Sequence, residues 1–149
     1  MQSLQPRSQR SQQIKLLKKT PTEGGKSRPA RTVSSKAREE SGAHLAFIRR
    51  LPCVITGKRP VDAAHIRYAA KAWGKPQTGV GTRADDRWSV PLHHDVHMDQ
   101  HAAGERAWWK KQGIDPLVLA HRLFFEAAGD VAKGEAIIAE TRAAKGGAK

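Results

Sequence analysis

Histidine is concentrated in one part of this chain. Five of its seven histidines lie between residues 65 and 101, and four of these fall within His93–His101. Imidazole binds divalent metal ions and exchanges a proton near neutral pH, because its pKa is about 6.5. His97 and His101 are four residues apart, which places both rings on one face of a helix. The pair is compatible with a metal site but is by itself a weak indication, since surface histidines take this spacing readily.

The residues upstream of the cluster predict a strand and a long loop. Cys53–Gly57 and Val61–Arg67 are short apolar runs around a turn at residues 58–60. This pattern predicts a hairpin or a strand that enters a turn, with His65 near the end of the second run. Residues 68–86 combine glycines and charges without periodicity, so they predict a long loop, which in a small domain is usually functional.

The residues that follow predict a second strand and then helices. Trp88–Leu92 reads as a short strand closed by Pro91, and a helical pattern starts at His93. Asp115–Pro116 is a typical helix start, and Gly129 is a suitable stop for that helix. A weaker helix is expected over Ala132–Ala144, which carries Ile137 and Ile138 among many small residues.

This order resembles the HNH endonucleases, whose site is a ββα-metal fold. The resemblance covers Cys53 to about Pro116, under half of the chain, and is closest to phage and prophage proteins similar to the RecA-dependent phage nuclease group. It is carried by five stretches, Cys53–Gly57, Asp62–Arg67, Asp85–Leu92, His97–Glu105 and Trp109–Pro116.

The resemblance implies an enzyme that hydrolyses phosphodiester bonds of nucleic acid, most simply in phage DNA recombination or processing. His65 matches the general base that activates water, and His97 and His101 match the metal-bearing helix. The implied cofactor is one divalent ion, Mg²⁺, Mn²⁺ or Zn²⁺, which would stabilise charge that develops as the bond breaks. The implied products have 5′-phosphate and 3′-hydroxyl ends.

The chain departs from the family pattern beside its histidines. Many relatives have a ligand immediately before the base, where Ala64 stands here, so Asp62, two residues earlier on the same strand face, is the predicted replacement. The family asparagine that orients the base falls at Trp88. Asp86 is the predicted substitute and would hydrogen-bond His65.

A structural zinc is not expected. Relatives often hold one with paired cysteines, but the corresponding positions here are Cys53, Thr56, His93 and Val96, and only Cys53 and His93 carry ligand atoms. We expect packing to replace the metal.

Basic residues flank the glycine-rich loop and could hold phosphates, although a solvated loop would have the same composition. They are Arg67, Lys71, Lys75 and Arg83. The four tryptophans are expected to pack in the core rather than to stack on bases, except that Trp108 and Trp109 cannot share one helix face, so one of them is expected to be exposed.

The composition points to a polyanionic partner. The chain of 149 residues carries 27 Lys and Arg against 14 Asp and Glu, a formal charge of +13. Residues 1–40 hold ten basic residues against three Glu with few large apolar side chains, so they predict a disordered basic arm. A short amphipathic helix is expected within residues 43–48, and the folded α+β domain is predicted over residues 41–145.

No stretch of about 18 apolar residues and no signal sequence is found, so a cytoplasmic protein without a membrane partner is expected. The single cysteine, Cys53, suits a reducing compartment. DNA is the expected partner, with RNA not excluded and a recombinase filament as a further candidate. Two alternatives remain, a non-catalytic nucleic-acid-binding module with a degenerate HNH fold and a basic RNA-binding or architectural protein.

Overall fold

A two-stranded antiparallel sheet lies at the centre of the computed structural model, which describes residues 40–78 and 82–147. Strand β1 (Asp62–His65) pairs with β2 (Ser89–Leu92) in a register that places Asp62 opposite Leu92 and His65 opposite Ser89. All of β2 is buried. The expected arm, residues 1–40, lies outside the described residues except for Glu40, and all that follows concerns the unit from Ser35 onward.

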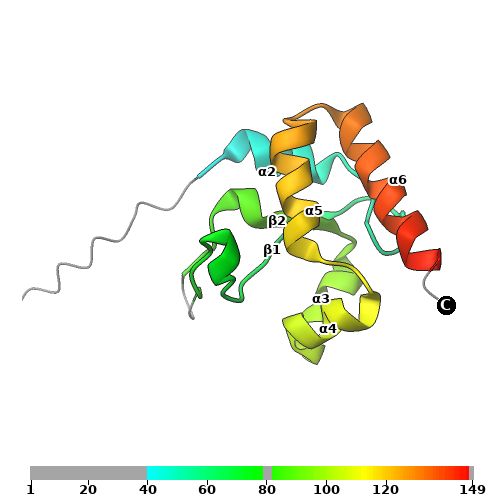
Figure 1. Cartoon of the computed structure of the whole chain (residues 1–149). Helices are drawn as coiled ribbons and strands as arrows, with labels where there is room; N and C mark the ends of the chain where they lie inside the picture. The colour runs from blue at the N-terminus through cyan, green and yellow to red at the C-terminus, as the bar shows by residue number, and fades with distance from the viewer. Residues whose placement is uncertain (1–39, 79–81, 148–149) are drawn as a thin grey trace, which may run out of the picture. The chain divides into compact units, whose positions relative to one another are not determined.

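Helices cover the sheet on several sides (Figure 1). Helix α2 (Gly42–Arg49) packs on both strands, α5 (Pro116–Arg122) packs on β2, and α3 (His94–Ala103) packs on β1. Helix α4 (Glu105–Gln112) lies against α3, and α6 (Val131–Gly147) lies against α5. The described residues thus form the predicted α+β fold. None of these helices is long and apolar enough to span a membrane.

The loop between the strands is only partly irregular. It contains the short 3-10 helix η1 (Lys71–Trp73) and ends in a second one, η2 (Asp86–Trp88), which leads directly into β2. Ala70 and Lys75 form an isolated antiparallel bridge around η1. These local hydrogen bonds give the loop a defined shape on each side of residues 79–81, which lie outside the described part.

Capping residues mark the helix boundaries, including the predicted start at Asp115. The Ser41 hydroxyl accepts the His44 N–H at the start of α2, and the Asp115 carboxylate accepts the N–H groups of Leu117 and Val118 at the start of α5. Gly113 ends α4 with a φ of +67°, which is favourable for glycine. A π-helical turn, η3 (Leu123–Ala127), extends α5 toward Gly129.

Two predictions about local structure are wrong. Cys53–Gly57 is a turn rather than a strand, because the Gly57 N–H donates to the Cys53 carbonyl and closes the backbone on itself. The partner of β1 is therefore β2, which is distant in sequence. Trp108 and Trp109 are both buried, with their rings edge to face at 4.8 Å, because the fold covers two sides of α4.

Helix α6 is longer than predicted and well packed. Ile137 and Ile138 are buried in the core. Gly134 is buried against Phe47 of α2 and against Leu51. A methyl group at Gly134 would lie 2.7 Å from Leu51 Cδ2 and 2.9 Å from Phe47 Cζ. The missing side chain therefore allows the close approach of α6.

We expect Gly134→Ala to lower the free energy of unfolding by about 1–3 kcal/mol, because overpacking outweighs the better helix propensity of alanine. Gly146→Ala is the control in the same helix, since no atom lies within 4 Å of the added carbon. It should leave stability unchanged or slightly raised. Urea denaturation of both variants measures the difference, and equal midpoints would contradict the close packing of α6.

Candidate metal and catalytic site

His65 and Asp86 form a hydrogen-bonded pair at the end of β1. His65 Nε2 lies 2.9 Å from Asp86 Oδ1, and the other carboxylate oxygen of Asp86 accepts the Ser41 N–H at 2.9 Å. Asp86 is only 2% exposed, so its charge depends on these donors. The contact predicted between Asp86 and His65 is present. Because the carboxylate accepts a hydrogen bond from Nε2–H, the proton of the neutral ring is on Nε2 and the lone pair is on Nδ1.

A second histidine lies beside this pair. His44, on α2, is buried, and burial lowers its pKa to about 4 against an opposing effect of the Asp86 carboxylate. The neighbouring His65 lowers the pKa of His44 further. His44 therefore stays neutral at physiological pH and adds no positive charge beside His65.

Asp62 connects β1 to the histidines of α3. Its Oδ2 atom lies 3.0 Å from His94 Nδ1 and 3.1 Å from His97 Nδ1. The hydrogen bond from His97 is the main cause of the lowered pKa of Asp62. Asp62 is predicted as a metal ligand. In the structure its carboxylate lies within hydrogen-bond distance of His97 Nδ1, and because a carboxylate only accepts, Nδ1 is the protonated nitrogen of that ring. Carboxylates commonly orient metal-binding histidines in this way.

The outer nitrogens of His97 and His101 face each other. Their Nε2 atoms are 3.1 Å apart, and the ring centroids are 4.6 Å apart. Two nitrogens that bind one cation at about 2.1 Å lie roughly 3.0–3.4 Å apart, so this spacing fits a shared ion. Burial, His97 and Arg67 together lower the pKa of His101, which favours the neutral form that a metal ligand needs.

The two imidazoles form an incomplete set of ligands. Within residues 40–78 and 82–147, no three His, Cys, Asp or Glu side chains are placed to hold one metal ion. Ions such as Mg²⁺ commonly keep several waters and bind substrate phosphates through the remaining positions. A site with few protein ligands is thus suited to an ion that binds together with a phosphate.

Arg67 follows His65 by two residues along the chain and lies near His101. His65 and Arg67 flank Ile66, which is fully buried, so both side chains point away from the core. The Arg67 guanidinium contributes to the lowered pKa of His101 and is therefore near that ring. Within the described residues the Arg67 guanidinium forms no hydrogen bond or ion pair, so this group is available to a phosphate. No hydrogen bond or ion pair joins the His65 pair to the His97 group within these residues.

The backbone of Arg67 is held by Glu105, which the sequence did not single out as a site residue. Both Glu105 oxygens accept the Arg67 N–H, at 3.1 and 3.0 Å, and Thr78 donates its N–H and its hydroxyl to the Arg67 carbonyl. Burial raises the pKa of Glu105 against these donors. The sequence signals for Glu105 are its place at the end of the resembling stretch His97–Glu105 and its position just after Gly104, at the start of α4.

The other predicted phosphate-binding residues differ in exposure. Lys71 and Arg83 are exposed, as this role requires. Lys75 needs correction, because it is only 2% exposed and its ammonium donates to the Tyr68 carbonyl at 2.7 Å. The bridge between Ala70 and Lys75 draws this lysine beneath the loop. Its role in the structure is to hold the loop.

The turn that contains Cys53 is held by hydrogen bonds to its sulfur. Burial alone would raise the pKa of the Cys53 thiol, but the His93 N–H, the Thr56 hydroxyl and N–H, and the Ile55 N–H together lower it. The sulfur thus contacts the residue that precedes α3. The His93 N–H, which donates to the Cys53 sulfur, connects the turn to the start of the helix.

We expect Glu105→Gln to loosen the backbone at Arg67, because the amide keeps one acceptor and turns a donor toward the N–H group. The loss should be about 1–2 kcal/mol. Hydrogen exchange should show faster exchange of the Arg67 amide. Glu126→Gln, at an exposed carboxylate paired with Arg122, is the control and should leave this amide unchanged. Equal exchange in both variants would rule out an anchoring role for Glu105.

The comparisons with known proteins give one match. No curated protein and no solved structure matches the chain. Residues 8–130 match the family described as Protein of unknown function (DUF968). Because this match spans most of the sequence, the chain belongs to the DUF968 family.

Proposed function

We propose that this protein is a metal-dependent endonuclease that hydrolyses phosphodiester bonds of nucleic acid, most simply of DNA, with an HNH-type ββα-metal site. One observation carries the proposal. Strands β1 and β2 and helix α3 hold an imidazole–carboxylate pair at one end of β1 and a carboxylate–imidazole–imidazole chain at the other. An antiparallel pair followed by a histidine-bearing helix is the element order of that site.

His65 is the proposed general base. The Asp86 carboxylate accepts a hydrogen bond from the Nε2–H group and leaves the Nδ1 lone pair to accept a proton from water. Because Asp86 is buried and also bound to the Ser41 N–H, the ring is fixed in one tautomer and orientation. Asp86 is thus a positioning residue, as predicted from its place in the sequence.

His97 and His101 are the proposed metal ligands, and Asp62 orients them through His97 Nδ1. A divalent ion, Mg²⁺, Mn²⁺ or Zn²⁺, would stabilise the negative charge that develops on the phosphate and on the leaving oxygen. Asp62 is therefore proposed to orient the His97 ring rather than to bind the metal ion directly. This differs from the sequence prediction in role but keeps the same residue.

Arg67 is proposed to hold the scissile phosphate. A guanidinium binds two phosphate oxygens at once, and its fixed backbone limits the entropy lost on binding. The formal charge of +13 supports a polyanionic substrate, since it attracts nucleic acid over long range. Lys71 and Arg83, both exposed, extend this positive surface along the loop.

A second candidate is a non-catalytic nucleic-acid-binding module. It is favoured by the lack of a third metal-binding side chain near His97 and His101 among the described residues. In such a protein the histidines would support the fold or contact phosphates. The two functions differ in what a divalent ion and the His65 ring contribute.

We expect His65→Ala to reduce the nicking of supercoiled plasmid in Mn²⁺ or Mg²⁺ by about 10²–10⁴-fold, because general-base catalysis contributes about this much. Asp99→Ala, at an exposed carboxylate of α3, is the control and should cleave normally. DNA binding in EDTA should be the same for all three proteins. Wild-type protein that binds DNA but cleaves no substrate in any metal would favour the binding module.

We expect His101→Ala to abolish the binding of Mn²⁺ and Asp62→Asn to weaken it about 10–100-fold, the usual effect of removing an orienting carboxylate. Calorimetric titration with MnCl₂ measures both effects, with Asp99→Ala again as the control. Wild-type affinity in the His101→Ala protein would exclude this histidine as a ligand. A complete loss in Asp62→Asn would instead indicate direct coordination by Asp62.

A further inference from the structure

Three neighbouring rings, one each from η1, α5 and η3, form a row that reaches the surface. The Trp73 and His121 ring centroids are 5.3 Å apart, and those of His121 and Phe125 are 4.7 Å apart. Phe125 is 56% exposed, the highest value among the large apolar side chains of the described residues, and the other two rings are half-buried. We name Trp73, His121 and Phe125 the aromatic strip.

Edge-to-face contacts with neighbouring rings hold the strip in place. Trp73 meets the buried Trp88 edge to face, with centroids 6.1 Å apart and planes at 84°. Phe125 meets Phe124 edge to face at 5.0 Å. Rings that are fixed before a ligand arrives lose little conformational entropy on binding. The strip is thus preorganised although its outer ring is exposed.

A second exposed apolar residue lies on the same face of α5 as the strip. Single exposed apolar residues are ordinary, but contiguous exposed apolar surface marks an interaction site. Val118, 42% exposed, lies one turn before His121 on α5 and continues the strip along the same helix face.

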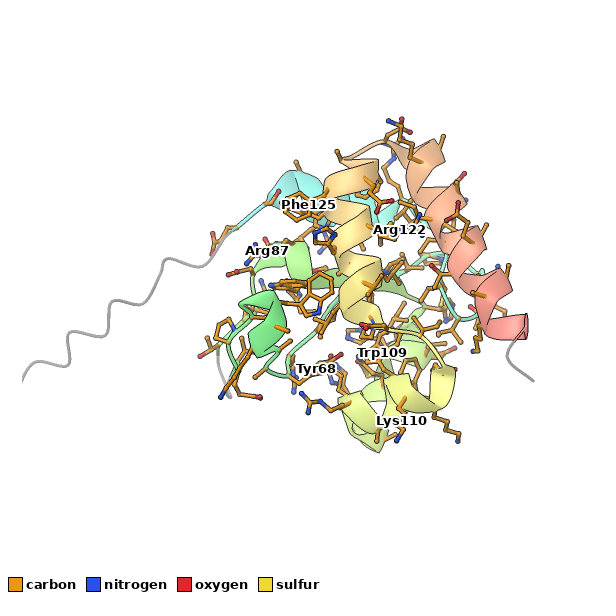
Figure 2. All side chains as sticks on the ribbon, in the orientation of Figure 1. Tyr68, Arg87, Trp109, Lys110, Arg122 and Phe125 are labelled. Atoms are coloured by element: carbon orange, nitrogen blue, oxygen red, sulfur yellow. The ribbon has the colours of Figure 1, made fainter. Side chains whose placement is uncertain are left out.

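The strip is connected to the proposed catalytic pair through η2. Trp88, which supports Trp73, belongs to the same helical turn as Asp86, which holds His65. Figure 2 shows Phe125 and Arg87 on the same side of α5, whereas Arg122 points to the other side. Helix η2 thus links the residue that supports the strip to the proposed catalytic pair.

Positive charge accompanies the rings. The Arg87 guanidinium lies 5.0 Å from the centre of the Trp88 ring, and the exposed Lys71 shares η1 with Trp73. Rings beside cations bind single-stranded nucleic acid, because bases stack on the rings while phosphates meet the charges.

We propose that the aromatic strip binds unpaired bases of a single-stranded segment of the nucleic acid. The inference rests on the proposed function for its polyanionic partner and adds a substrate feature, namely bases that are not paired. A duplex hides the faces of its bases, so the strip would favour single strands, frayed ends or gaps over intact duplex.

The test is the binding of a fluorescein-labelled oligothymidylate to the full chain in EDTA, followed by fluorescence anisotropy. Phe125→Ala should weaken binding about tenfold, since one stacked base contributes about this much or more. Phe125→Trp should bind as the wild type or more tightly. Phe125→Leu is the matched control, because it keeps apolar area without a ring, and it should resemble Phe125→Ala. Affinity for a blunt duplex should stay the same in all variants.

Three results would overturn the proposal. Wild-type affinity for the oligonucleotide in both Phe125→Ala and His121→Ala would exclude stacking on the strip. Wild-type binding by Phe125→Leu would indicate apolar contact without stacking. A change of oligomeric state in Phe125→Ala, seen by light scattering, would assign the strip to a second copy of the chain. Binding in EDTA does not depend on cleavage, so this test and the nicking assay can fail independently of each other.

Discussion

The buried carboxylate of Asp86 is the interaction on which the arrangement of the site depends. A charge that is 2% exposed is costly unless donors surround it, and here they come from two distant segments, the His65 ring of β1 and the Ser41 N–H before α2. The same requirement that keeps the charge satisfied therefore fixes η2, β1 and α2 relative to one another. The orientation of His65 is a consequence of this constraint.

The β1–β2 register has a comparable effect on the second group of histidines. Asp62 stands opposite Leu92, only two residues before α3 begins at His94. The carboxylate is thus within reach of the first turns of the helix, where it meets His94 and His97. A slip of one residue would turn every side chain of β1 to the other face and separate these groups. The fully buried Ala64 fixes this register, because the face of β1 that carries Ala64 packs in the core.

Local signals predicted much of the fold. The cap at Asp115 and the strand before His93 depend on neighbouring residues, which a sequence displays directly. The pairing of β1 was not predictable in this way. Cys53–Gly57 and Ser89–Leu92 are both short apolar runs, and only the tertiary fold shows that the first closes into a turn while the second pairs.

The site shows the same division between local and distant information. The spacing of His97 and His101 and the contact between Asp86 and His65 were predicted from motif positions. The role of Glu105 was not, because its two hydrogen bonds reach Arg67 across 38 residues of sequence. Lys75 was misjudged for the opposite reason. Its charge suggests the surface, but its backbone bridge to Ala70 buries it.

Hydrogen bonds join the turn at Cys53 to the residue before α3 and to strand β2. The thiol contacts the N–H groups of Ile55, Thr56 and His93, so one sulfur connects its own turn to the residue before α3. The Val54 N–H adds a bond to the Pro91 carbonyl of β2. Each contact is individually weak, but together they join the same two segments that a four-ligand zinc site would join. The orientation of α3, and with it the position of His97 and His101, therefore depends on hydrogen bonds and packing within the described domain.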